Sequence, residues 1–190
     1  MSAKKRASRA PAILIFGEDD NDRTAIQELV LALCPSAPRL EKRRKPLVLV
    51  KGREAARARK NATDLAAVVR ADEARFDVKL VLAHQDCDAV EPAHQQAADT
   101  IERTLAEAGV HALAVVPAFE MEAWWFLWPD AATQVNTGWR RPAKTGQRVG
   151  LITNAKEELR RCLRPASREK RPRDYEESDG PRIPGRCRPR

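Results

Sequence analysis

The feature that most constrains the fold is a series of short apolar runs separated by segments with helical spacing. The runs cover residues 12–16, 47–50, 78–83 and 111–116. Each run is almost continuously apolar, which is typical of strands that are covered on both faces. Parallel strands of this kind need long crossover connections, and these are usually helices. The sequence therefore predicts an α/β fold with a mostly parallel sheet and helices on both of its faces.

The segments between the runs supply the predicted helices. Residues 22–33 carry apolar side chains at helical spacing, and the alanine-rich residues 54–75 form helices readily. Further helices are predicted over residues 93–108, within FEMEAWWFLW at 119–128, and over residues 154–163. Residues 35–46 and 129–148 are predicted to be loops, the first of them strongly basic.

Composition indicates one ordered domain with basic ends. Residues 1–11 are expected to form a flexible basic arm, residues 12–164 an α/β domain, and residues 165–190, rich in Pro and Arg, a poorly packed tail. The four cysteines have no metal-binding spacing, which favours a reducing compartment. No apolar stretch reaches the roughly 18 residues of a membrane span, and the start lacks the features of a signal peptide. We therefore expect a cytoplasmic protein that does not associate with membranes.

Acidic residues recur directly after the predicted strands. Glu18 follows the first strand, Asp86 and Asp88 follow the third, and Glu120 and Glu122 follow the fourth. Because neighbouring parallel strands lie about 4.8 Å apart and end at one edge of a sheet, these carboxylates can converge. Crowded carboxylates repel one another unless a cation or a proton neutralises them, and oxygen ligands alone favour Mg²⁺ or Mn²⁺. The alternative is that they are exposed loop acids or helix caps, a role open to Asp22 and Asp88.

The residues around the first acid resemble the first motif of the Toprim fold, a Rossmann-like arrangement. Residues 15–26 read Ile-Phe-Gly-Glu-x-x-x-Asp-Arg-x-Ala-Ile, and Asp86 with Asp88 resembles the Asp-x-Asp of the second motif. Glu122-Ala-Trp and the stretch YEESDGPRI at 175–183 are similar to parts of small stand-alone Toprim-like proteins of the overcoming-lysogenisation-defect type. Such proteins often accompany a partner ATPase in bacterial defence loci. Asp19 departs from the pattern, because the family usually has glycine there.

The resemblance implies a nuclease that uses Mg²⁺ to cleave phosphodiester bonds of nucleic acid, in antiviral defence and with a partner ATPase. By this resemblance the catalytic residues would be Glu18, Asp22 and Glu122, with Glu18 as general acid or base. The metal ligands would be Glu18, Asp86 and Asp88. Asp22 could instead cap the following helix. Water is the expected nucleophile, because the only tyrosine, Tyr175, lies in the tail, far in sequence from the carboxylates.

The charge of the chain favours a polyanionic partner. The formal net charge is +8 and the sequence pI about 9.7, a balance that promotes association with nucleic acid. The candidate nucleic-acid-binding residues are Arg39, Lys42, Arg43, Arg44, Lys45, Lys144 and Arg148. Clusters of this kind bind phosphates without reading sequence. A solvated basic surface without a ligand is the equal alternative.

Two other functions remain open at this level. One is a non-catalytic Toprim-like subunit that binds nucleic acid or a partner protein, and the other is a phosphohydrolase of small phosphate esters. Metal-dependent cleavage separates the nuclease from the first, and salt-dependent polynucleotide binding counts against the second. His84 lies just before the second motif, and two roles are open for it: donating a proton to the substrate, or a structural role.

Overall fold

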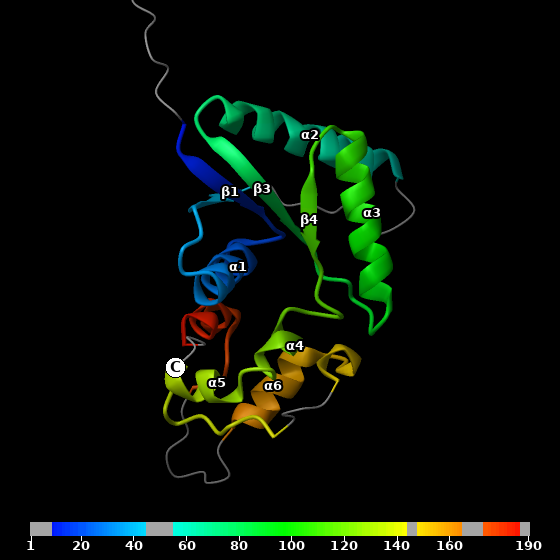
Figure 1. Ribbon diagram of the computed structural model, residues 1–190. Coiled ribbons are helices and arrows are strands. Elements are labelled where there is room, and N and C mark those ends of the chain that lie inside the picture. Colours follow the sequence, from blue (N-terminus) through cyan, green and yellow to red (C-terminus); the bar gives the residue numbers. More distant parts are fainter. Residues whose placement is uncertain (1–8, 45–54, 144–147, 165–172, 187–190) are drawn as a thin grey trace, which may run out of the picture.

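The fold is built on a sheet of four parallel strands. The computed structural model describes residues 9–44, 55–143, 148–164 and 173–186. The strands are β1 (Pro11–Phe16), β2 (Arg39–Arg43), β3 (Asp77–His84) and β4 (Ala112–Val115), in the order β2-β1-β3-β4. Helices cover both faces of the sheet (Figure 1). The predicted α/β class is confirmed, and the arrangement is consistent with a Rossmann-like fold of the Toprim type.

Six α-helices follow the order expected from the sequence, with one addition. They are α1 (Asp20–Leu33), α2 (Ala55–Glu73), α3 (Ala93–Glu107), α4 (Glu122–Trp125), α5 (Pro129–Val135) and α6 (Ala155–Leu163). Three 3₁₀ turns, η1 (Val149–Leu151), η2 (Glu177–Arg182) and η3 (Pro184–Arg186), complete the described elements. The addition is α5, which lies inside a predicted loop. Its first residue is Pro129, whose fixed φ suits the start of a helix, and it buries Ala131 and Ala132.

Alternate residues of the strands belong to two separate cores. Ile13 and Ile15 of β1 pack with α1 and the C-terminal half of the chain. Leu14 and Phe16 pack with α2 and α3 on the other face. Figure 1 shows α1 opposite α2 and α3 across the sheet, with α4, α5 and α6 gathered in the lower part of the view. The two-residue period of a strand therefore explains why the central runs are apolar throughout.

The second strand corrects the sequence prediction. Residues 39–43 were expected in a basic loop, but they form β2, which pairs in parallel with β1 at the edge of the sheet. Its charged side chains are tolerated because they find partners on both sides: Arg43 pairs with Asp72 of α2, and Lys42 donates to Thr24 of α1 at 2.7 Å. The run 47–50, predicted as a strand, lies outside the described residues.

The C-terminal segment also differs from the expectation of a poorly packed tail. Within residues 173–186, Tyr175 and Ile183 are almost completely buried in the same core as α1. Asp179 is buried too and pairs with Arg173. In Figure 1 this segment, in red, lies beside α1. Two buried side chains, Tyr175 and Ile183, and the ion pair of the buried Asp179 thus hold a stretch whose composition is that of a disordered tail.

The strand ends define the place where a site can form. Phe16 pairs with Ala83 of β3 and with Arg43 of β2, and His84 pairs with Val115 of β4. All four strands therefore run toward the same edge, and the residues that follow them leave the sheet together. Among the described residues, no helix is long and apolar enough to cross a membrane.

Candidate active site

A pocket of about 320 Å³ lies at this edge, and carboxylates dominate its lining. The acidic residues at the pocket are Glu18, Asp19, Asp22, Asp86, Glu120, Glu122 and Glu177. Glu18 follows β1, Asp86 follows β3, and Glu122 begins α4, so elements distant in sequence supply the charge. The structure thus brings together Glu18, Asp22, Asp86 and Glu122 among the predicted site residues. We refer to this space as the acidic pocket.

Burial, with a smaller contribution from neighbouring charges, raises the pKa of two of these carboxyl groups. Burial, with a smaller contribution from the charges of Glu120 and Asp86, raises the pKa of Glu122 to about 7. Burial likewise raises the pKa of Asp22 to about 6; the nearby His84 opposes this, and the charge of Asp86 adds to it. Crowded carboxyl groups that resist ionisation are typical of sites that exchange protons or accept a cation.

The turn that carries Glu18 is fixed by its neighbours in the first motif. Asp19 is the N-cap of α1: its side chain accepts from the Asp22 N–H at 2.9 Å, and Asp22 accepts in return from the Asp19 N–H at 3.3 Å. The buried Arg23 guanidinium donates to the carbonyl of Gly17 at 3.0 Å. Asp19 has an extended backbone with φ −133°, so this position does not require glycine. A helix cap explains its departure from the Toprim pattern.

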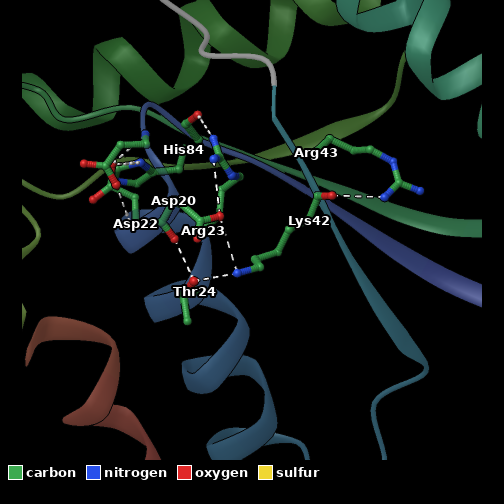
Figure 2. Close-up of polar contacts among 9 residues, drawn as sticks. Asp20, Asp22, Arg23, Thr24, Lys42, Arg43 and His84 are labelled. Atoms are coloured by element: carbon green, nitrogen blue, oxygen red, sulfur yellow. Dashed lines mark hydrogen bonds and ion pairs between the residues drawn. The ribbon is translucent and has the colours of Figure 1, made fainter. Parts of the chain in front are cut away.

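His84 lies beneath the pocket, between two of its acids. Its ring is completely buried, with Nδ1 at 3.7 Å from Asp22 Oδ2 and Nε2 at 3.4 Å from Asp86 Oδ1. Neither ring nitrogen makes a hydrogen bond of good geometry with the described residues. Figure 2 shows His84 beside Asp22, with Lys42 reaching toward Asp20 and Thr24 from the other side of α1. A buried ring cannot reach a substrate, so the arrangement favours support of the carboxylates over proton donation to a phosphate.

Asp88 does not join the acidic pocket. The prediction that Asp86 and Asp88 point the same way assumes an extended backbone, but Asp88 has φ 55°, in the left-handed region. Its N–H donates to the carbonyl of Phe119 at 3.0 Å, and its side chain is exposed. It lines a second cavity of about 460 Å³ against α3, which Asp86 also lines. Residues two apart point the same way only in an extended backbone, and this turn is not extended. The arrangement therefore does not support Asp88 as a ligand shared with Glu18.

The carboxylate oxygens that line the acidic pocket are the kind of ligand that Mg²⁺ prefers, but they do not form a complete ligand set. Within the described ranges, no three carboxylate, imidazole or thiolate groups lie close enough together to hold a metal ion. Mg²⁺ usually takes only one or two protein carboxylates and completes its shell with water and substrate phosphates. The buried Asp86 Oδ1 accepts no hydrogen bond from the described residues. Glu18 and Asp86, which follow the neighbouring strands β1 and β3, both line the pocket.

The predicted nucleic-acid-binding residues have mixed surroundings. Arg39 pairs with Glu41 and stacks over Phe76, and Lys42 and Arg43 are engaged as described above. The half-buried Arg43 is held by Asp72 in a two-point contact, which gives it a structural role. Arg44 and Arg148 are exposed. Lys45 and Lys144 lie outside the described residues.

Sequence reasoning missed the residues that close the pocket from the C-terminal side. Lys156 of α6 lines it and pairs with Glu177. The buried Tyr175 also lines it, although its place in the tail predicted the opposite. The only signal in the sequence was the similarity of residues 175–183 to the C-terminal part of Toprim-like proteins, which predicts no contact with the carboxylates.

Comparison with known proteins adds no relative to these observations. No protein-family model matches the chain, and no match is found among the curated proteins or the solved structures. The geometry of the acidic pocket and the strand-end motifs are therefore the basis for any statement about function.

Proposed function

We propose that the protein is a Mg²⁺-dependent nuclease of the Toprim type, acting at the acidic pocket. The observation that supports this most is the convergence of Glu18, Asp22, Asp86 and Glu122 on one pocket at the carboxyl edge of a parallel sheet. Ligands of open α/β sheets bind at this edge. The net charge of +8 fits a polyanionic substrate. The defence role and the partner ATPase implied by the resemblance remain predictions.

Each carboxylate has a role that its surroundings favour. Glu18 and Asp86 would hold the ion, which when bound polarises the scissile phosphate and makes a bound water more acidic. Glu122 and Asp22, with pKa values raised to about 7 and about 6, can take up and release a proton near neutral pH. We therefore assign proton transfer to these two residues rather than to Glu18. His84 would keep the carboxylates of Asp22 and Asp86 in place from below.

A cleavage assay with a matched pair of variants tests the proposal. The full chain is incubated with plasmid DNA, single-stranded DNA and RNA, in Mg²⁺ and in EDTA. Wild type is expected to cleave at least one of them in Mg²⁺ only, and Asp86→Asn to cleave none. Asp130→Asn is the control, because Asp130 is an exposed acid of α5 that pairs with Arg141 away from the pocket. Cleavage by Asp86→Asn at the wild-type rate would overturn the proposal.

Two added measurements, thermal melting with and without Mg²⁺ and hydrolysis of a small aryl phosphate ester, address the two alternatives. The observation that favours a non-catalytic subunit is that no group of three potential metal ligands is found among the described residues. An inactive wild type whose melting temperature does not respond to Mg²⁺ would support that reading. Hydrolysis of a small aryl phosphate ester, with all polynucleotides left intact, would instead support the phosphohydrolase.

A further inference from the structure

The single tyrosine of the chain reaches the acidic pocket from the C-terminal segment. Tyr175 is 1% exposed, and its hydroxyl donates to Glu122 Oε1 over 3.4 Å. The two residues lie 53 positions apart in sequence. A phenol that contacts a carboxylate of the pocket is a candidate for part of the site and not only for part of the core.

The surroundings of Tyr175 fix the direction of its hydroxyl. The indole nitrogen of Trp125 lies near the phenolic oxygen, both beside Gly180, and the hydroxyl donates to Glu122 Oε1. Gly180 permits this packing: a Cβ there would lie 3.1 Å from the phenolic oxygen and 3.5 Å from the Trp125 nitrogen. Arg160 of α6 holds the backbone, since its Nε donates to the Tyr175 carbonyl at 3.0 Å.

The same segment forms a wall of the acidic pocket. Glu177, Gly180 and Pro181 line it together with Tyr175. The segment is tied down by the pair of Arg173 with the buried Asp179 and by the pair of Glu177 with Lys156. The pocket is therefore incomplete without residues 173–186.

We propose that Tyr175 is a positioning residue of the acidic pocket, which holds the Glu122 carboxylate in place through its hydroxyl and makes the C-terminal segment part of the site. Burial raises the pKa of the phenol well above its usual value, so Tyr175 acts as a hydrogen-bond donor and not as a phenolate nucleophile. A fixed second partner keeps a catalytic carboxylate in one orientation, and losing such a partner typically costs about 10- to 100-fold in activity. This proposal rests on the nuclease function proposed above.

Tyr175→Phe tests the proposal through activity, because it removes only the hydroxyl and keeps the ring. We expect kcat to fall about 10- to 100-fold while KM changes less than about twofold and the far-UV circular dichroism spectrum is retained. The control is Asp130→Asn, which breaks a pair with Arg141 outside the lining of the pocket. Wild-type kcat in Tyr175→Phe would overturn the proposal.

A second measurement does not depend on activity. With one tyrosine in the chain, a protein labelled with ¹³C at tyrosine Cζ gives one NMR signal that reports on this phenol alone. Glu122→Gln, compared with wild type at about pH 8.5, above the pKa of about 7 of Glu122, is expected to move the signal, and Asp130→Asn is expected to leave it in place. An unmoved signal in Glu122→Gln overturns the proposal whatever the activity. A moved signal with an inactive wild type upholds the contact and rejects the nuclease function.

Discussion

Replacing Glu122 by Gln should stabilise the metal-free protein at alkaline pH, although the residue belongs to the proposed catalytic set. Raising a carboxyl pKa from 4.5 to about 7 corresponds to about 3 kcal/mol, at about 1.4 kcal/mol per pKa unit. Well below the ordinary pKa of 4.5, the carboxyl group is protonated in the folded and the unfolded chain, so it has no effect on the free energy of unfolding. As the pH rises to about 7, the unfolded chain releases its proton first and the folded state loses stability.

Urea unfolding in EDTA, followed by circular dichroism between pH 5 and pH 8, measures the effect. Glu122→Gln should exceed wild type by less than about 1 kcal/mol at pH 5 and by about 3 kcal/mol at pH 8. Asp22, with its pKa raised to about 6, weakens both proteins in the same range and largely cancels in the difference. Glu157→Gln is the control, since Glu157 is an exposed acid of α6. A difference that is the same at every pH, or a less stable Glu122→Gln at pH 8, would refute the reasoning.

Three further outcomes follow from the same structure. Asp86→Asn should abolish Mg²⁺-dependent cleavage without lowering the melting temperature in EDTA, whereas Asp88→Asn, outside the acidic pocket, should keep at least half of the wild-type rate; equal losses in both would restore the Asp-x-Asp pair as a shared ligand set. Arg43→Gln should cost about 3 kcal/mol in urea unfolding, because it leaves the buried Asp72 carboxylate unpaired; an unchanged free energy of unfolding would make Arg43 a surface residue. Gly180→Ala should cost about 1 kcal/mol by crowding the phenol beside it, and a melting temperature equal to that of wild type would contradict this packing.

The elements that the sequence predicted are those whose own residues determine them. The apolar runs of β1 and β3 and the alanine-rich α2 carry their signal locally, so their existence and type were predictable. The placement of Glu18 and Asp86 at one edge was predictable as well, because parallel strands end together. This prediction needed only the rule that parallel strands end at one edge of a sheet, and no knowledge of individual contacts.

The elements that were mispredicted depend on partners distant in sequence. In β2, the stretch RLEKR has one apolar residue, and it is a strand because β1 pairs with it and Asp72, 29 residues away, takes up Arg43. Tyr175 was excluded from the site for its place in a Pro- and Arg-rich stretch, yet it packs on Glu122. Hydrophobic periodicity contains no information on such pairings.

The prediction for the turn after β3 was wrong for a local reason. Asp88 has a left-handed backbone, with φ 55°, so the Asp-x-Asp stretch is not extended throughout. Asn and Asp adopt this conformation more readily than most residues. A spacing motif therefore predicts shared ligands only where the backbone between them is extended.

The measurement that tests the central claim most directly is a crystal structure of the full chain grown in Mn²⁺ with a short oligonucleotide, with the ion located by its anomalous scattering. The account predicts an ion in the acidic pocket, in direct contact with carboxylate oxygens of Glu18 and Asp86 and with a phosphate oxygen of the oligonucleotide. A pocket without an ion at saturating Mn²⁺, or an ion bound at Asp88 instead, would contradict it.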